Sequence, residues 1–226
     1  MTRIKLDMHT HCEYSPDSRT PVAAQAAAIK AVGIDVVCAT DHNTIEGALR
    51  LRELADGFRV IVGEEITTRE GEIIGLFLER QIERGLSAEE TIERIHEQGG
   101  IVSVPHPFSH NRINHIRRDA LERVASTIDC VEVFNAREVF AADNRRAAAF
   151  ALDRGIAGAV ASDAHRPWEL GRAWLEVDAF EGRDDFLAAI RGGTVHGRLA
   201  GSAIHFLTRY DKLLKWMGAR RTTPRR

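Results

Sequence analysis

Five polar clusters, each rich in histidine or carboxylate side chains, follow short apolar runs in this chain of 226 residues. Each run has the length of a β-strand. Imidazole and carboxylate groups that converge in space form sites for divalent metal ions. The clusters therefore constrain the fold, which has to bring several strand ends together. They are Asp7-Met8-His9-Thr10-His11, Thr40-Asp41-His42-Asn43, Gly63-Glu64-Glu65, Val104-Pro105-His106-Pro107 and Ser162-Asp163-Ala164-His165.

Helical patterns separate most of the apolar runs. The first predicted helix has Thr20 as its cap and Pro21 in its first turn, and it ends at Gly33. Ser87 and Glu90 form the sequence signature of a capping box at the start of another helix. Alternation of strands and helices implies a parallel sheet covered by helices. The predicted strands lie near residues 3–8, 34–39, 59–63, 72–78, 101–104, 129–134, 157–161 and 173–177.

This alternation predicts the α/β fold class, and a barrel suits seven or eight units in about 200 residues better than an open sheet does. In a barrel, the strand ends meet on one face and can surround a single centre. In an open doubly wound sheet, the same residues would spread along a line. We therefore expect a single β/α barrel domain over residues 1–202.

The C-terminal segment, residues 203–226, differs in charge from the rest of the chain. It holds seven Lys or Arg residues and one Asp, a net charge of +6, so the preceding residues carry −8. Ile204, Leu207, Leu214 and Met217 predict an amphipathic helix. We expect residues 220–226 to form a disordered basic tail, since a basic end is more often solvated than bound to nucleic acid or membrane.

The overall composition is that of a globular protein, with 44% hydrophobic residues, 28% charged residues and a net charge of −2. The three cysteines, Cys12, Cys38 and Cys130, form no C-x-x-C pair, which argues against a disulfide framework. The sequence shows neither a signal peptide nor a run of about 18 apolar residues. We therefore expect a cytoplasmic protein without a membrane partner, and the sequence leaves its oligomeric state open.

The spacing of the clusters suggests which side chains act together. His9 and His11 are two residues apart in a predicted strand, so both point to the same side and can bind one metal ion. Asp163 and His165 repeat this spacing near the end of the chain. Glu65 could bridge two metal ions through its two oxygens. Its neighbour Glu64 competes for that role, because strand alternation directs only one of them inward.

Three further residues have a structural and a functional interpretation. His106 lies between Pro105 and Pro107, a stiff loop that suits a ligand but is equally typical of a rigid turn. Asp41 could orient a ligand, or it could cap the helical stretch 45–56. Asp17 lies in a turn-like loop, where aspartate is common for structural reasons.

Taken together and in order, these motifs resemble the PHP (polymerase and histidinol phosphatase) family over about residues 4–200. The resemblance implies a distorted seven-stranded β/α barrel, and a metal-dependent phosphoesterase with two or three zinc, manganese or iron ions. It rests on Asp7-x-His9-x-His11 with Ser15-x-Asp17, Thr40-Asp41-His42, Gly63-x-Glu65, Pro105-His106-Pro107, Glu132-Val133-Phe134-Asn135 and Ser162-Asp163-Ala164-His165.

The resemblance also implies a role for each residue. One metal ion would be held by His9, His11, Glu65 and Asp163, another by Asp17, His42 and His165, and a third by Glu65 and His106. Supporting residues or further ligands would be Asp7, Glu132 and Asn135. The chain departs from the family pattern after Glu65. Many members have a histidine there in a run like H-x-L-G, and the sequence suggests Ile73 or Ile74 in its place.

Hydrolysis is the reaction class that the sequence favours. The chain has no G-x-S-x-G elbow and no phosphate-binding G-x-x-x-x-G-K-[ST] loop, which leaves a metal-activated hydroxide as the nucleophile. Asp41, Arg112 and Arg137 are the candidate catalytic residues, and the two guanidinium groups would bind phosphate. We expect the substrate to be a small phosphorylated metabolite or a nucleotide.

Three other functions remain open at this stage. Related barrels hydrolyse C–N bonds with similar metal centres, so an amidohydrolase-like activity is the first alternative. A PHP-type exonuclease is the second, although aromatic residues make up only 6% of the chain and do not alternate with basic ones. A metal-binding module without catalysis is the third, and the nearly complete ligand set argues against it. A measurement of metal content, together with a screen of phosphate and amide substrates, distinguishes these functions.

Overall fold

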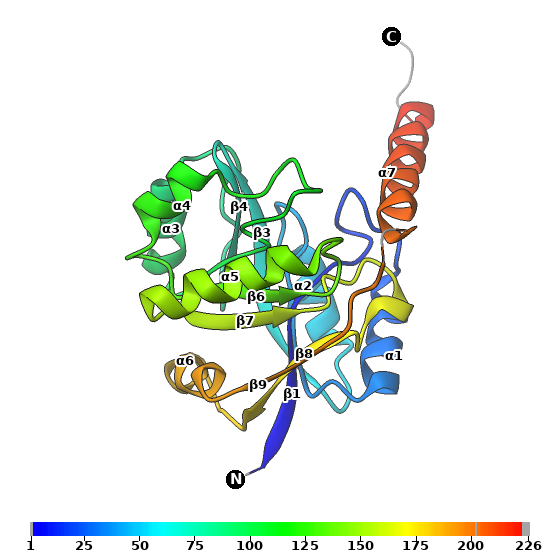
Figure 1. Cartoon of the computed structure of the whole chain (residues 1–226). Helices are drawn as coiled ribbons and strands as arrows, with labels where there is room; N and C mark the ends of the chain where they lie inside the picture. Colours follow the sequence, from blue (N-terminus) through cyan, green and yellow to red (C-terminus); the bar gives the residue numbers. More distant parts are fainter. Residues whose placement is uncertain (1, 202, 223–226) are drawn as a thin grey trace.

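A strongly curved sheet with helices on its outside makes up the body of the protein (Figure 1). The computed structural model describes residues 2–201 and 203–222. The elements are β1 (Arg3–Thr10), α1 (Val22–Val32), β2 (Val36–Ala39), α2 (Glu46–Glu53), β3 (Arg59–Thr68), β4 (Gly71–Leu76), α3 (Ala88–Glu97), β5 (Ile101–Val104), α4 (Arg118–Val124), β6 (Cys130–Asn135), α5 (Ala141–Arg154), β7 (Ala157–Ala161), the 3-10 helix η1 (Pro167–Glu169), β8 (Ala173–Asp178), α6 (Arg183–Arg191), β9 (Thr194–Gly197) and α7 (Ala203–Thr222).

The sheet is mixed, with strand order β7-β6-β5-β4-β3-β2-β1-β8-β9. β1, β2 and β3 run parallel, as do β5, β6 and β7, whereas β4, β8 and β9 are antiparallel to their neighbours. The expectation of a parallel sheet is therefore wrong for these three strands. Only Arg69 and Glu70 connect β3 to β4, and so short a connection allows only an antiparallel pair. β9 was not predicted.

The sheet closes almost into a barrel because β1 contacts a different strand at each end. Residues 3–6 of β1 pair with β8. At the other end of β1, the Asp163 N–H donates to the His9 carbonyl at 2.9 Å, and the His11 N–H donates to the Ala164 carbonyl at 2.8 Å. The segment after β7 thus reaches β1, and the predicted distorted β/α barrel is confirmed. This closure brings the first and last ligand clusters side by side.

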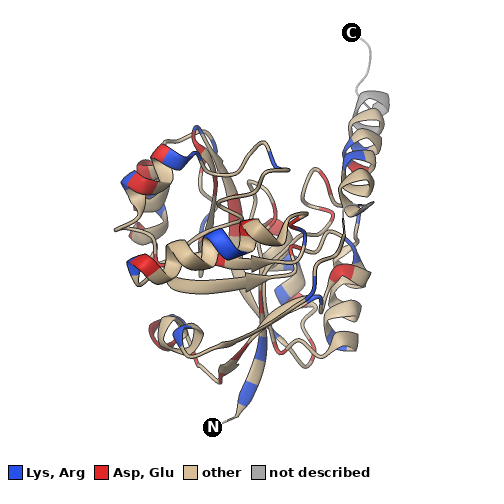
Figure 2. Ribbon diagram, in the orientation of Figure 1, with Lys and Arg blue, Asp and Glu red and all other residues tan. Residues whose placement is uncertain are grey.

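Two hydrophobic cores lie on the two sides of the sheet. One lies between the strands and the covering helices and includes Ile29, Leu51 and Ile95. The other includes Met8, Leu76 and Phe186, so α6 contributes to it. Most ligand clusters lie at or just after the ends of the parallel strands, whereas Glu64 and Glu65 lie within the longer strand β3. Lys and Arg are interspersed with Asp and Glu on the covering helices (Figure 2), in keeping with the net charge of −2.

Most predicted helix boundaries are confirmed. The Ser87–Glu90 capping box precedes α3, and Gly33 ends α1 in the left-handed conformation. Thr20, however, does not cap α1, because its hydroxyl donates to the His165 carbonyl at 2.7 Å. Pro21 takes the N-cap position without a side-chain cap. Thr20 therefore anchors the loop that carries a candidate ligand.

α7 forms at the C-terminus, where a helix is predicted, and it projects from the barrel (Figure 1). It extends to Thr222, so residues 220–222 are helical rather than part of the expected disordered tail. Residues 223–226 of that tail lie outside the described residues. Of the predicted apolar face, Ile204 is buried but Leu207 and Met217 are exposed. The reason is that α7 lies against the polar rim of a pocket and not against a hydrophobic core.

The three cysteines are buried free thiols, in agreement with the absence of a disulfide framework. Across the described part of the chain, no helix is both long enough and apolar enough to cross a bilayer.

We expect Ser87→Ala to destabilise the fold by about 1 kcal/mol, because it removes the side-chain acceptor of the α3 N-terminus. Urea unfolding followed by circular dichroism measures the change. Ser126→Ala, at an exposed position outside the helices, is the matched control. Equal stability of the two variants would contradict the role of the capping box.

Candidate metal centre

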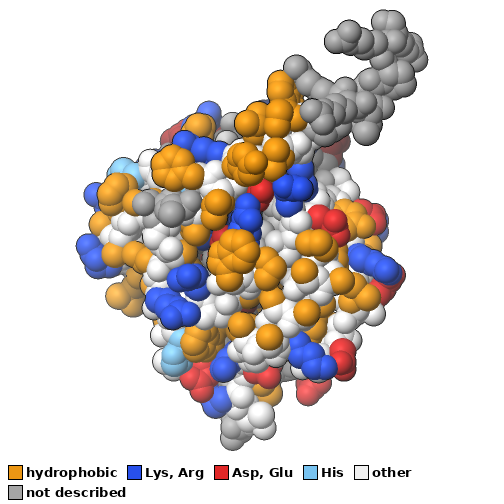
Figure 3. Space-filling view, turned by 90° about the vertical axis from the view of Figure 1, so that its right-hand side faces the viewer, with side chains coloured by type: hydrophobic (Ala, Val, Ile, Leu, Met, Phe, Trp, Pro, Cys, Tyr) orange, Lys and Arg blue, Asp and Glu red, His pale blue; other side chains and the backbone are white. Residues whose placement is uncertain are grey.

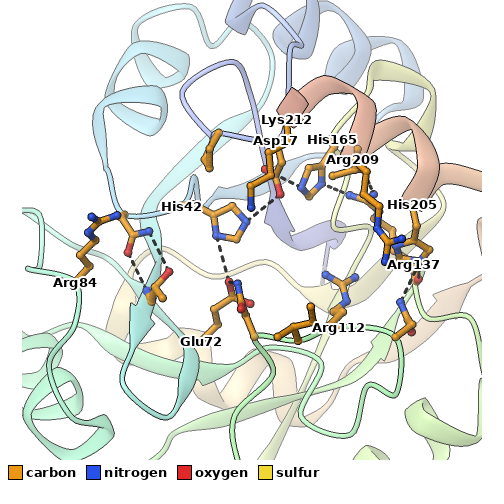
Figure 4. A pocket seen from close by; sticks show the side chains of 17 residues that line it. Asp17, His42, Glu72, Arg84, Arg112, Arg137, His165, His205, Arg209 and Lys212 are labelled. Carbon is orange, nitrogen blue, oxygen red and sulfur yellow. Dashed lines mark hydrogen bonds and ion pairs between the residues drawn. The ribbon is translucent and has the colours of Figure 1, made fainter. Parts of the chain in front are cut away.

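A pocket of about 530 Å³ opens at the rim where the polar strand ends gather. Asp17, His42, Glu72 and His165 are among the residues that line it. Figure 4 shows that these side chains point toward one another across the pocket, although they come from separate segments. These four candidate ligands are therefore reached from one side, through the pocket.

Four predicted ligand atoms form a first group beneath this pocket. His9 Nε2 lies 2.8 Å from His11 Nε2 and 3.2 Å from Glu65 Oε2. Asp163 Oδ1 lies 3.8 Å from His9 Nε2 and 3.5 Å from His11 Nε2. Tetrahedral ligands at metal distances of about 2.0–2.1 Å are separated by about 3.4 Å. The spacing of the four atoms therefore suits a bound cation.

Hydrogen bonds fix the orientation of both imidazoles. His9 Nδ1 lies 2.7 Å from Glu132 Oε1, and His11 Nδ1 lies 2.8 Å from Ser15 Oγ. The Ser15 hydroxyl itself donates to Asp41 at 2.7 Å, so its oxygen accepts from His11. Both Nδ1 atoms therefore carry hydrogen, which leaves the two Nε2 atoms, facing each other, as the positions where a proton or a metal ion binds. Facing lone pairs repel, and a shared cation removes that repulsion.

A second group is built around Asp17. Its Oδ1 lies 3.3 Å from His165 Nε2, and its Oδ2 lies 3.5 Å from His42 Nε2. Ligand atoms of His11, His42 and His165 also lie within 4.8 Å of one another. The structure thus brings together the three residues predicted for a second metal ion, with His11 beside them.

A third group shares Glu65 with the first. Glu65 Oε1 lies 3.1 Å from His106 Nε2, whereas Glu65 Oε2 faces His9, His11 and His42. The two oxygens of one carboxylate therefore point into different groups, which is the geometry of a bridging ligand. Glu64 points elsewhere and accepts from the Ile82 N–H at 2.9 Å.

Glu72 completes the third group, a role that the sequence analysis missed. Its Oε1 lies 3.6 Å from His42 Nδ1, and its Oε2 lies 3.9 Å from His106 Nε2. Ile73 and Ile74, which were compared with the family's histidine, lie in the two hydrophobic cores instead. Counting back from Gly75 in the pattern H-x-L-G places Glu72 at the histidine position, so the signal was available. The chain carries a carboxylate where an imidazole was expected.

The predicted supporting residues contact the ligands directly. Glu132 accepts from the His106 N–H at 2.8 Å in addition to orienting His9. The Asn135 side-chain amide donates to Asp163 Oδ2 at 3.1 Å. Asp7 lies deeper and accepts from the Ser162 N–H at 2.9 Å, and burial raises its pKa to about 7. Asp7 therefore joins β1 to the end of β7.

Asp41 lies behind the centre, which does not favour its assignment as a catalytic residue. Its carboxylate accepts from the Cys12 N–H at 2.8 Å and from the Ser15 hydroxyl. It does not cap α2 either, since Ile45 occupies the N-cap position without a side-chain cap. Asp41 acts on the site through Ser15, which orients His11. It is a positioning residue.

Both predicted arginines reach the pocket, but each already has acidic partners. Arg112 donates to Asp163 Oδ2, and its Nε lies 3.5 Å from Glu138 Oε1. Arg137 donates to the Asp163 carbonyl at 3.3 Å, and its Nε lies 3.6 Å from Glu169 Oε2. The two guanidinium groups therefore hold the Asp163 segment and also present positive charge to the pocket.

Two candidate ligands lie on backbone that L-amino acids rarely adopt. His106, between Pro105 and Pro107, has φ 30°, and Asp163 has φ 52°. Such conformations cost about 1–3 kcal/mol each and persist where the surrounding structure fixes them. Both residues follow the end of a buried strand. The strain turns the chain so that both side chains face the centre.

The charge balance of the centre calls for cations. Burial disfavours the ionised carboxyl of Asp163, but Arg112 and His9 outweigh it and hold its pKa well below its usual range. Burial also lowers the pKa of His9, but Glu65, Asp163 and Glu132 raise it well above its usual value. In this environment a proton and a metal ion compete for Nε2 of His9. The donor set therefore fits divalent metal ions.

Several basic residues at the pocket were not predicted as site residues. Arg84 lines one side, and His205, Arg209 and Lys212 reach it from α7 (Figure 4). The net charge of +6 over residues 203–226 was the available signal. It was interpreted as a solvated tail because no sequence pattern fixes the direction in which α7 leaves the barrel.

Comparison with known families agrees with this geometry. The PHP domain matches residues 7–144, and the PHP-associated family PHP_C matches residues 141–195. The chain belongs to the PHP family. The two matched regions together run from the first ligand cluster to the strand β9. Solved structures with the same fold include two proteins described as predicted or putative metal-dependent phosphoesterases.

Relatives and solved structures support the same fold. An uncharacterized protein of Methanocaldococcus jannaschii is 44% identical over 146 residues, which cover 59% of this chain and 82% of that protein. A two-domain protein from Bacteroides vulgatus, containing a predicted PHP-like metal-dependent phosphoesterase, gives a TM-score of 0.70 at 20% identity. The match covers 87% of this chain and 65% of that protein. The lesion-specific endonuclease of Pyrococcus furiosus gives a TM-score of 0.57 at 16% identity, covering 86% of this PHP chain and 58% of the endonuclease.

We expect Glu65→Gln to reduce bound metal by about one equivalent or more, because it removes the charge shared by two groups of ligands. Glu64→Gln is the matched control, since its amide oxygen can still accept from the Ile82 N–H. Elemental analysis after dialysis against Mn²⁺ measures the difference. Equal metal content in the two variants would show that Glu65 is not a bridging ligand.

We expect Glu72→Ala to weaken metal binding, and Glu72→His to retain it, since an imidazole at this position also offers a donor atom. Titration with Mn²⁺, followed by calorimetry, should show one weaker site in the alanine variant only. If both variants bound metal as the unmodified protein does, Glu72 would have no part in the centre.

Proposed function

We propose that the protein is a metal-dependent phosphoesterase that hydrolyses a small phosphorylated metabolite or a nucleotide. One observation carries the proposal: a buried cluster of imidazoles and carboxylates opens into a pocket with cationic side chains on its walls. The cluster supplies metal ligands, and the cations suit an anionic substrate. A phosphate ester combines both requirements, because its phosphoryl oxygens bind metal ions and guanidinium groups alike.

Each part of the site has a task in this reaction. Divalent ions held by these residues would supply an activated water and positive charge for the phosphoryl oxygens. The first metal ion would be held by His9, His11, Glu65 and Asp163. Glu132 and Ser15 fix the orientation of the two imidazoles. Arg112 and Arg137 add positive charge beside Asp163, where negative charge develops on the phosphoryl group.

The pocket favours a small substrate over nucleic acid. Its volume of about 530 Å³ suits a molecule of metabolite or nucleotide size, and α7 contributes to its wall. An endonuclease activity, by analogy with the Pyrococcus furiosus protein, and a C–N hydrolase activity are the alternatives. A confined pocket with several cations suits a small phosphate ester better than it suits an amide or a nucleic-acid strand.

The experiment is a substrate screen with the Mn²⁺-loaded protein. We expect hydrolysis of p-nitrophenyl phosphate and of at least one sugar phosphate or nucleotide, loss of activity with a chelator, and recovery when metal is restored. Hydrolysis of amides, or of oligonucleotides alone, with every small phosphate ester left intact, would replace the proposal with the corresponding alternative.

We expect Arg112→Ala to lower kcat/KM on the best phosphate ester by roughly 10², the loss typical of one electrostatic donor in the transition state. Arg112→Lys should recover part of this, because it keeps the charge but not the bidentate geometry. Arg52→Ala, on the outer surface of α2, controls for the loss of an exposed positive charge. Unchanged kinetics of Arg112→Ala, with normal metal content, would remove Arg112 from the mechanism.

A further inference from the structure

α7 presents two different faces to its surroundings. Residues 205, 208, 209 and 212 all line the pocket, a helical spacing that places them on one side of α7. The opposite side exposes apolar residues, with Phe206 71% and Tyr210 56% exposed. Figure 3 views the molecule from this side and shows hydrophobic side chains next to the grey end of the helix. The polar side of α7 is thus the side turned toward the metal centre.

Polar contacts along its length hold α7 in this orientation. His205 Nε2 lies 2.8 Å from the Arg137 carbonyl oxygen, and Thr208 accepts from the Arg137 guanidinium. Further along, Asp211 pairs with Arg166, and Lys215 donates to the carbonyl of Ser15. These contacts tie α7 to the same loops that carry the candidate ligands, so its pocket-facing side chains have a defined position.

Arg209 and Lys212 differ in their contacts from Arg112, Arg137 and Lys215. Arg112 and Arg137 are ion-paired with carboxylates, and Lys215 is bound by backbone carbonyls. Among the side chains that the structure describes, neither Arg209 nor Lys212 has a hydrogen-bond or ion-pair partner. Two such cations, three residues apart on one helix face and directed into a pocket, are available for an anion from solution.

We propose that Arg209 and Lys212 form a second anion subsite, and that the physiological substrate is a small phosphate ester with a second phosphoryl group. This inference rests on the proposed function, in which the reacting phosphate lies at the metal centre beside Arg112 and Arg137. The α7 cations then bind the phosphoryl group that does not react. They select the substrate and take no part in bond cleavage.

The test compares kcat/KM of the Mn²⁺-loaded protein on glucose 6-phosphate and glucose 1,6-bisphosphate, which differ by one phosphoryl group. We expect the bisphosphate to be preferred about tenfold or more, the effect of one or two charged hydrogen bonds. In the double variant Arg209→Gln with Lys212→Gln, this ratio should fall at least tenfold, mainly through a higher KM for the bisphosphate.

The matched control is Arg50→Gln with Arg52→Gln, which removes two exposed charges from α2 and should keep the ratio. An equal rate on both sugars, or an unchanged ratio in the α7 variant, would overturn the subsite while leaving the phosphoesterase proposal intact. Hydrolysis of neither sugar, nor of any other ester in the screen, would instead contradict the phosphoesterase proposal itself. A preference for oligonucleotides over both sugars would overturn the small-substrate class.

Discussion

The Glu65 carboxylate lies where the first and third groups of ligands meet, and the arrangement around it depends on how its charge is balanced. One oxygen faces His9, His11 and His42, and the other faces His106. Burial raises the free energy of an ionised carboxylate by several kcal/mol unless cations offset it. Asp163 adds a second buried negative charge in the same place. Metal ions are the cations that bind along the lone pairs of these carboxylate oxygens.

The barrel is the means by which distant segments reach Glu65. Its closure at the ends of β1 and β7 places His9 and His11 beside Asp163, and strained backbone at His106 and Asp163 turns both side chains inward. Because β4 is antiparallel to β3 and β5, it begins near the rim where the parallel strands end, and Glu72 near its start joins the third group there. Distortion of the barrel is therefore linked to the composition of the centre.

Much of the site could be predicted, because strand ends and two-residue spacing are local features. His9 and His11 share a side of β1. Strand alternation turns only one of Glu64 and Glu65 inward, and the family resemblance selects Glu65. Other features depend on distant contacts. Asp41 proved to act through Ser15, and the approach of α7 to the pocket depends on contacts such as that of Asp211 with Arg166, which no local pattern encodes. Glu72 is different, because the pattern H-x-L-G aligned on Gly75 places its histidine position at Glu72 without any knowledge of distant contacts.

The most direct test of this account is an anomalous difference map from crystals grown with Mn²⁺. The account predicts one peak among His9, His11, Glu65 and Asp163, and a second peak that shares the Glu65 carboxylate. A map without a peak next to Glu65, in a crystal whose protein retains its bound Mn²⁺, would contradict the central role given to that residue.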